Sequence, residues 1–395
     1  MAIKIKSIFQ KIKALFDKYP WLYIVLMFIF WRLIIQIVVW WGDIRFDDAG
    51  YPYPTAVPGT KFLAAWAKWD SVYYYEIMNN GYNEHILEFF PLFPYISKAV
   101  NWIIGNHQLI ATTFVVNFFA LASCLMLYDL AKLENNNDEK FAQRAVFFML
   151  IFPSAFFLVA HYTESLFLFL LITSFYCIRK KAYFKSGIFG MFASATRATG
   201  ILAFPALIVD QMGDTWSEIK QKIVKRKIEW KKILPLCLVP LGFIAFLLLA
   251  QVQFNNPFKM FEAQKAFGRK VEINLLKPVH KELKNIFNLN LFYDEIPTNA
   301  FNYVLFWSLF LIAVILLFKY SRPSYAVLGF LFFAVPAFSG TLISMNRFLL
   351  TLFPIYFLLA KLIPPNTIWE KLYIIFSFAF FIHIMLLFTN GFWVG

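Results

Sequence analysis

Apolar segments separated by short charged loops recur along the whole chain, and they constrain its fold more than any other feature. Of the 395 residues, 60% are hydrophobic and only 15% are charged, whereas a soluble domain is about half apolar. Because a backbone in lipid must satisfy its own hydrogen bonds, such segments cross the membrane as helices of about 20 residues. The sequence therefore predicts an all-α polytopic membrane protein with a single transmembrane domain over residues 21–395.

The basic residues predict how the chain is oriented. The net charge is +14, but Lys and Arg occur in short runs beside apolar segments, which is typical of cytoplasmic membrane edges and argues against nucleic-acid binding. Residues 1–20 carry apolar positions at helical spacing among lysines, so we expect an amphipathic helix on the cytoplasmic leaflet. The first apolar segment, 21–41, has no small-residue cleavage site behind it and is expected to remain as a span.

Residues 86–104 decide the topology of everything that follows. They are apolar enough to suggest a span, but a crossing there would turn the basic stretches around Arg179 and over 219–232 outward, against the positive-inside rule. We therefore expect a surface helix inside a first external loop over 42–108. A second external loop is expected over 253–299. We expect the protein to lie in the plasma membrane of a prokaryote, with its N-terminus in the cytoplasm.

The remaining apolar segments predict a bundle of about nine spans. One segment, 186–211, lies between two basic loops, is too short to cross twice and carries Arg197 at its middle, so we expect a re-entrant pair of half-helices. After the first span, further spans are expected at 109–132, 145–160, 163–179, 233–252, 300–318, 324–341, 345–362 and 370–389.

Asp70 is the first candidate for chemistry on the expected outer side. It follows Trp69 and precedes Tyr73 and Tyr74, in a loop whose aromatic residues suit a membrane–water boundary. A carboxylate placed there can act as a general base toward a hydroxyl of a lipid headgroup. The alternatives are a solvated loop carboxylate or a helix cap.

Glu164 and two arginines form the second group of candidates. Glu164, next to His161, can orient an acceptor, pair with an arginine or cap the helix expected to begin there. Arg197 and Arg347 are expected to bind a lipid phosphate, because guanidinium matches phosphate oxygens bidentately. Their alternative is snorkelling or a structural ion pair. Three cations of the second loop are expected mainly as a solvated face: Lys265, Arg269 and Lys270.

No metal or redox site is indicated by the sequence. The three cysteines, Cys124, Cys177 and Cys237, lie in apolar stretches without CxxC spacing, which indicates small core or lipid-facing residues. The histidines have no metal-ligand spacing, and no glycine-rich phosphate loop is present. No cofactor is therefore expected.

Several short motifs occur in one order along the chain. They are Trp69-Asp70-Ser71 with Gly81-Tyr82 and the FFPLFP of 89–94, PSAFF at 153–157 with YTESLF at 162–167, TRATG at 196–200, NPF at 256–258 with EAQ at 262–264, and SMNRF at 344–348. This ordered set resembles PIG-V-type mannosyltransferases, which are integral membrane glycosyltransferases of the GT-C class. The departures from the family pattern are Val72, Tyr73, Asn256 and Phe348, where a small residue, Trp, Asp and Tyr are usual.

The resemblance implies transfer of a hexose, usually mannose, from a polyprenyl-phosphate sugar to a lipid or glycan acceptor on the extracytoplasmic side, with inversion. In such enzymes a first-loop aspartate is the base, which here is Asp70. We expect Arg197 and Arg347 to hold the donor phosphate. The residues expected to bind substrate are Trp69, Tyr73, Tyr74, His161, Glu164 and Gln264.

Two other classes of function remain open at this point. A transporter or flippase of lipid-linked saccharides typically shows internal repeats and charges in paired halves, and the sequence shows neither. A scaffold without activity is the third alternative.

Overall fold

The computed structural model describes residues 18–45, 61–227, 229–266, 268–287 and 298–395, and this part of the chain is helical without any strand. The predicted amphipathic helix lies almost entirely outside the described residues, as do 46–60 of the first loop and 288–297 of the second. The helices are α2 (Pro20–Arg45), α3 (Lys61–Ala64), α4 (Ser71–Asn80), α5 (Leu92–Ile103), α6 (Gln108–Glu134), α7 (Glu139–Leu150), η1 (Ala155–Leu158), α8 (Glu164–Arg179), α9 (Tyr183–Thr196), η2 (Ala198–Leu202), α10 (Ala203–Met212), α11 (Trp216–Val224), α12 (Trp230–Ile233), η3 (Leu234–Leu238), α13 (Val239–Phe254), α14 (Lys259–Ala266), α15 (Leu276–Phe287), α16 (Thr298–Tyr320), α17 (Pro323–Ala337), α18 (Met345–Thr351), α19 (Pro354–Leu362) and α20 (Ile368–Thr389).

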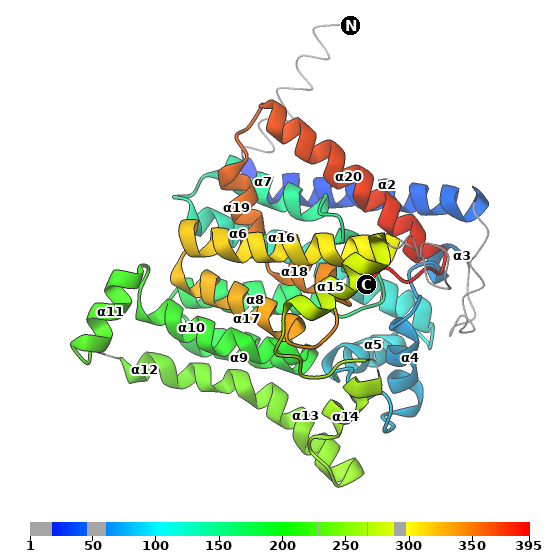
Figure 1. Ribbon diagram of the computed structural model, residues 1–395, viewed down its shortest axis with the longest axis horizontal. Coiled ribbons are helices and arrows are strands. Elements are labelled where there is room, and N and C mark those ends of the chain that lie inside the picture. The colour runs from blue at the N-terminus through cyan, green and yellow to red at the C-terminus, as the bar shows by residue number, and fades with distance from the viewer. Residues whose placement is uncertain (1–17, 46–60, 228, 267, 288–297) are drawn as a thin grey trace, which may run out of the picture.

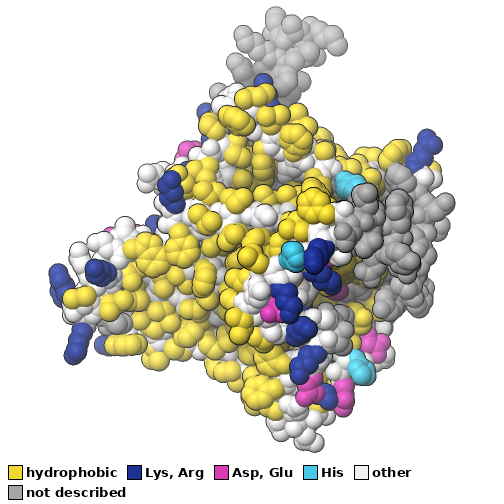
Figure 2. Space-filling view, in the orientation of Figure 1, with side chains coloured by type: hydrophobic (Ala, Val, Ile, Leu, Met, Phe, Trp, Pro, Cys, Tyr) yellow, Lys and Arg dark blue, Asp and Glu magenta, His cyan; other side chains and the backbone are white. Residues whose placement is uncertain are grey.

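Within the described residues, 5 helical stretches are long and apolar enough to cross a membrane: α2, α6, the run from α12 through α13, α16 and α20. A bent pair, α18 with α19, raises the number to 6. Hydrophobic side chains also cover much of the surface over these helices (Figure 2). The prediction of a multi-pass membrane protein is therefore confirmed, while the count of nine spans stays a prediction, since the other helices are shorter.

Two predicted spans are not continuous helices in the structure, and a proline lies at each interruption. The segment expected at 145–160 ends its helix at Leu150 and continues as a turn and the short η1. The segment expected at 345–362 is broken into α18 and α19, which meet at 79°. Pro153 and Pro354 lie at these breaks, and proline cannot donate the backbone hydrogen bond that would continue a helix.

The two unusual segments of the predicted topology have the expected local shapes. Helix α5 has 12 residues, about 18 Å of length, so 86–104 contains no spanning helix. The segment around Arg197 folds as α9, then η2 and α10, with extended backbone at the arginine. Arg179 and Asp214, which flank this segment, form an ion pair of 3.0 Å, so the chain returns to the end at which it started.

The bundle has two different ends (Figure 1). One end carries α11 and α12 with their lysines, and a cluster of partly exposed ion pairs ties the helices together there. That cluster joins Arg179 of α8 and Arg322, next to α17, to Glu134, Asp210 and Asp214. The opposite end carries α4, α5 and α14, together with the breaks between α7 and α8 and between α17 and α18.

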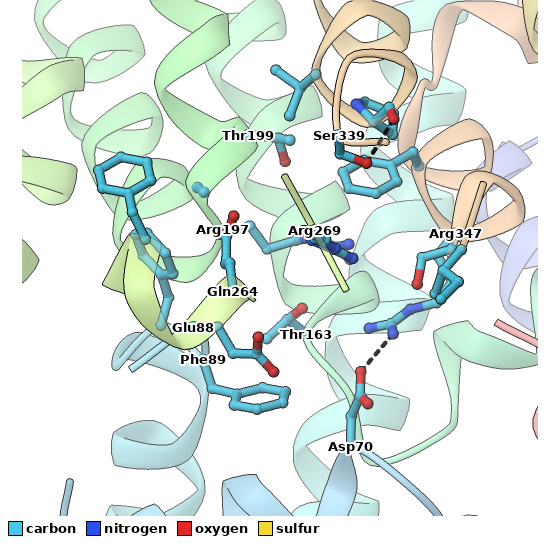
Figure 3. Close-up of a pocket in the computed structure, with 18 of the residues that line it drawn as sticks. Asp70, Glu88, Phe89, Thr163, Arg197, Thr199, Gln264, Arg269, Ser339 and Arg347 are labelled. Carbon is cyan, nitrogen blue, oxygen red and sulfur yellow. Dashed lines mark hydrogen bonds and ion pairs between the residues drawn. The ribbon is translucent and has the colours of Figure 1, made fainter. Parts of the chain in front are cut away.

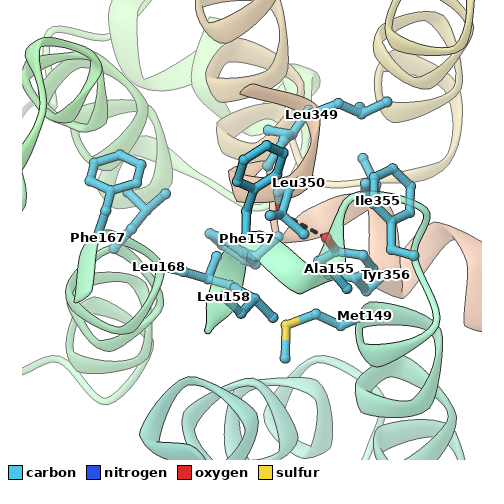
Figure 4. Close-up of a cluster of buried hydrophobic side chains, with 14 of the residues drawn as sticks. Met149, Ala155, Phe157, Leu158, Phe167, Leu168, Leu349, Leu350, Ile355 and Tyr356 are labelled. Atoms are coloured by element: carbon cyan, nitrogen blue, oxygen red, sulfur yellow. Dashed lines mark hydrogen bonds between the residues drawn. The ribbon is translucent and has the colours of Figure 1, made fainter. Parts of the chain in front are cut away.

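A dense apolar core lies at the centre of the bundle (Figure 4). Phe157 and Leu158 of η1 are fully buried against Phe167 of α8 and Leu350 of α18. Tyr356 of α19 donates its hydroxyl to the Leu350 carbonyl at 2.7 Å, which satisfies a carbonyl next to the break between α18 and α19. The broken helices are thus held in place by packing and not by helical continuity.

Candidate active site

Asp70 and Arg347 meet although 277 positions separate them in the chain. Asp70 stands immediately before α4, but its side chain makes no capping hydrogen bond. Its Oδ2 instead accepts a hydrogen bond from Nη1 of Arg347 at 2.5 Å (Figure 3). The helix-cap alternative for Asp70 is therefore excluded, and the convergence of the first loop with the start of α18 is confirmed.

Glu164 is the centre of the same charge arrangement. It is the first residue of α8, has 0% exposure, and its Oε1 accepts hydrogen bonds from Nε of Arg347 at 2.6 Å and from Nη1 of Arg197 at 2.6 Å. Of the three alternatives for Glu164, pairing with an arginine is the one realised. Asp70, Glu164, Arg197 and Arg347, here named the inner ion cluster, contain two positive and two negative side chains and balance one another.

Unusual backbone positions hold the inner ion cluster. Trp69, just before Asp70, has φ of 55°, and Ser344, just before α18, has φ of 66°. Side chains other than glycine rarely adopt this left-handed region, and such positions concentrate at functional sites. The Asp70 N–H donates to the Tyr162 hydroxyl at 3.1 Å, and the Arg347 guanidinium lies over the Tyr162 ring at 4.5 Å. One buried tyrosine thus positions both ends of the ion pair.

A cavity of about 670 Å³ opens beside this cluster, between the first loop, α9, α14 and the end of α17. Tyr73 is stacked on Phe89 at 4.8 Å, and Trp69 makes an edge contact with Trp393 at 5.2 Å, so the cavity has fixed aromatic walls. Of the residues predicted from the sequence, those that line it are Trp69, Asp70, Tyr73, Tyr74, Arg197, Gln264 and Arg347.

Two predicted substrate-binding residues do not line the cavity, and their assignment needs correction. His161 is 1% exposed, and its ring nitrogens bond to the Tyr75 hydroxyl at 2.7 Å and the Thr113 hydroxyl at 3.0 Å. Glu164 lies behind the two arginines that it binds. Protein partners occupy both ring nitrogens of His161 and Oε1 of Glu164, so we assign both residues to positioning other groups.

Glu88 and Trp393 were not predicted from the sequence, and Arg269 was expected mainly as part of a solvated face. All three line the cavity. Glu88 directly precedes the FFPLFP motif, so its position was a usable signal, and Arg269 follows Gln264 by five residues. Trp393 lies beyond the last predicted span, where no pattern in the sequence indicates a role.

Charge in the cavity is unevenly distributed. Burial raises the pKa of the Glu88 carboxyl to about 8, the Asp70 charge adds to this, and Arg269 and Arg347 oppose it. Glu88 is therefore mostly protonated at neutral pH. Burial lowers the pKa of the Arg269 guanidinium, which among the described residues has no ion-pair partner within 4.0 Å. Lys265 and Lys270 line the same cavity, so the cavity has a positive surplus that suits an anion.

Within the described part of the chain, no three His, Cys, Asp or Glu side chains come together as metal ligands.

Comparison with known proteins identifies the family of the chain. Residues 54–331 match the family described as "Mannosyltransferase (PIG-V)". The chain is 28% identical over 147 residues to GPI mannosyltransferase 2 of Yarrowia lipolytica, which covers 37% of this chain and 40% of that protein. It is 26% identical over 211 residues to GPI alpha-1,6-mannosyltransferase 2 of Cricetulus griseus, which covers 49% of this chain and 42% of that protein. The alignments thus include less than half of the length of either relative.

Solved structures show a similarity of weaker kind. ArnT from Cupriavidus metallidurans, bound to undecaprenyl phosphate, gives a TM-score of 0.47 with 13% identity over 93% of this chain and 76% of that chain. AglB from Archaeoglobus fulgidus, in complex with an inhibitory peptide and a dolichol-phosphate, gives 0.44 with 13% identity over 96% and 57%. The family match covers well over half of the chain and includes Asp70, Glu88, Glu164, Arg197 and Arg269, while Arg347 lies beyond it. The long apolar helices make the chain a multi-pass membrane protein, and the protein belongs to the PIG-V mannosyltransferase family.

Proposed function

We propose that the protein is an inverting hexosyltransferase that moves mannose from a polyprenyl-phosphate sugar to a hydroxyl of a lipid or glycan acceptor on the extracytoplasmic face. The observation that carries the proposal is the cavity, because its wall brings together the Asp70 carboxylate and the Arg269 guanidinium, which has no ion-pair partner among the described residues. A base and an anion-binding group are the two elements that transfer from a sugar phosphate requires.

The proposed reaction follows from these positions. Asp70 removes the proton of the acceptor hydroxyl, and the acceptor oxygen bonds to C1 of the hexose. The bond between C1 and the phosphate oxygen breaks on the opposite face, which inverts C1 and releases polyprenyl phosphate. Arg347 holds Oδ2 of Asp70, while Oδ1 accepts no hydrogen bond from the described residues. That oxygen is therefore the one we assign to the incoming proton.

The donor phosphate is assigned primarily to Arg269, with Lys265 and Lys270 at the rim. The leaving phosphate gains negative charge as its bond to C1 breaks, so cations beside it favour the transition state more than the ground state. Arg197 and Arg347, predicted from the sequence for this role, line the same cavity. Because Glu164 and Asp70 already neutralise them, we propose that they act on the phosphate at longer range.

The apolar side of the cavity suits the polyprenyl chain. Val335 and Phe338 at the end of α17 line the cavity and are 46% and 41% exposed, as is Phe261 of α14 at 48%. A lipid tail can leave the cavity past these side chains toward the membrane. The proposed extracytoplasmic placement rests on the positive-inside rule applied to the lysines and arginines around α11 and α12. Figure 2 shows that Lys and Arg also occur over the loop that carries α14 and α15, where the proposal assigns them to the donor phosphate.

The direct test of the function uses the purified protein in vesicles with polyprenyl-phosphate mannose labelled in the sugar and octyl mannoside as acceptor. Appearance of a labelled dimannoside glycolipid, with polyprenyl phosphate as the second product, is the expected result. Movement of the intact donor across the bilayer without a new glycoside would identify a flippase instead.

Replacing Arg269 with glutamine is expected to weaken binding of polyprenyl-phosphate mannose by about 10- to 100-fold, which corresponds to one lost hydrogen bond to a charged group. The dissociation constant can be measured by quenching of tryptophan fluorescence, since Trp69 and Trp393 line the cavity. Lys281→Gln, an exposed cation on α15, is the matched control and should bind as the unmodified protein does. Equal affinities of the Arg269 and Lys281 variants would remove Arg269 from the phosphate site.

A further inference from the structure

Glu88 is the one carboxyl group of the cavity wall that the proposed reaction leaves without a task. The cavity is lined by Asp70 and Glu88, and Asp70 is held by Arg347. Glu88 is half-buried, and it has no hydrogen bond or ion pair within the described part of the chain. A solvated carboxyl with no role is the simplest alternative, and the local structure argues against it.

The backbone around Glu88 is fixed on both sides. Leu87 has 0% exposure and Phe90 has 2%, and both pack in the same apolar cluster with Phe246 of α13. The Tyr82 hydroxyl donates to the Phe89 carbonyl at 2.7 Å, which anchors the residue immediately after Glu88. With its neighbours buried, the Glu88 side chain is directed into the cavity, beside Gln264 and Thr163 (Figure 3).

We propose that Glu88 is a substrate-binding residue that hydrogen-bonds hydroxyl groups of the donor hexose. The inference rests on the proposed function, since it takes the donor to be a sugar joined to a phosphate. Arg269 lines the same cavity as Glu88, and its charge acts to lower the pKa of the Glu88 carboxyl. A hexose is attached to its phosphate through a single oxygen, so a phosphate on Arg269 brings the sugar ring next to Glu88.

The protonation state of Glu88 matters for this role. A protonated carboxyl both donates and accepts, so it can bind two neighbouring sugar hydroxyls, whereas a carboxylate only accepts and adds a negative charge beside the phosphate. Burial raises the pKa of Glu88 to about 8, which keeps the protonated form dominant below that pH. The charged and titratable groups of the surrounding elements that face the cavity are Asp70, Tyr73, Tyr74, Arg197, Lys265, Arg269, Lys270 and Arg347.

The test compares two lipids, polyprenyl-phosphate mannose and polyprenyl phosphate without sugar, for binding to the full chain in detergent. Glu88→Ala should lose about tenfold in affinity for the sugar-bearing lipid and bind the sugar-free lipid as the unmodified protein does. Glu88→Gln, which donates and accepts like the protonated acid, should bind both lipids normally. Glu76→Ala on α4, outside the cavity, is the matched control.

The pH dependence supplies a second readout. In the unmodified protein, the preference for the sugar-bearing lipid should decrease above pH 8, and in Glu88→Gln this decrease should be absent. Equal losses for both lipids in Glu88→Ala, no loss at all, or an alkaline decrease that persists in Glu88→Gln would each overturn the inference. If the unmodified protein fails to bind either lipid, the proposed function itself is wrong. If Glu88→Ala binds both lipids normally, the proposed glycosyl transfer is unaffected, and only the contact between Glu88 and the sugar is wrong.

Discussion

Asp70→Asn is expected to lower the turnover number for mannose transfer by about 10²- to 10⁴-fold, the range over which a positioned general base contributes to catalysis. Asparagine keeps the shape of the side chain, and its amide oxygen can still accept from Arg347, but it cannot take the proton of the acceptor. Binding of polyprenyl-phosphate mannose should change little, because the phosphate is assigned to Arg269. The measurement is the rate of labelled glycolipid formation at saturating donor.

The control for this prediction is Asp43→Asn, since Asp43 is an exposed carboxylate near the end of α2. It should keep the rate of the unmodified protein. Melting temperatures of both variants show whether lost turnover reflects lost folding. Turnover of Asp70→Asn within a few-fold of the unmodified rate would show that another group removes the proton.

Glu164→Gln is expected to cause the largest loss of stability of any single substitution considered for this chain. The substitution leaves Arg197 and Arg347 buried without their common carboxylate, and breaking a buried ion pair by removing one partner costs about 3–5 kcal/mol. The free energy of unfolding, followed by denaturant titration in detergent, should fall by this amount. Activity should fall as well, because Arg347 would no longer be held against Asp70.

Two further variants test whether the loss of stability comes from the burial of the ion pair or only from the removal of a charge. Glu139→Gln breaks a pair with Lys132 in which the Glu139 side chain is 44% exposed, and exposed pairs contribute about 0–1 kcal/mol. The double variant Glu164→Gln with Arg197→Gln removes one buried charge of each sign and should regain part of the lost stability. A Glu164→Gln protein as stable as Glu139→Gln would contradict the structural role given to the inner ion cluster.

Hydrophobic pattern was sufficient to predict the long helices, because their apolar length is a local property of the sequence. The helices α2, α6, α16 and α20 follow the expected segments within a few residues. The interruptions near Pro153 and Pro354 were not predicted, since the window that detects a span averages over a single proline. Whether a proline kinks a helix or ends it depends on packing from distant segments, which the local sequence does not contain.

The site was predictable in its centre and less so at its edge. Asp70 and Arg347 were identified because their residue types and motifs indicate chemistry on their own. Glu164 was identified with several alternatives, and only the position of two distant arginines decides among them. Glu88 carries only a positional signal, since a single glutamate before an aromatic motif resembles an ordinary boundary residue until its neighbours are seen to be buried.

The contact between Asp70 and Arg347 also has a consequence for how the protein is made. Because 277 positions separate these residues, the first loop leaves the ribosome long before the segment that binds the carboxylate proposed as the base. A nascent chain that ends before α18 therefore inserts most of its helices but holds Asp70 without its partner. If the proposed function holds, competence for transfer is therefore expected only near the end of synthesis.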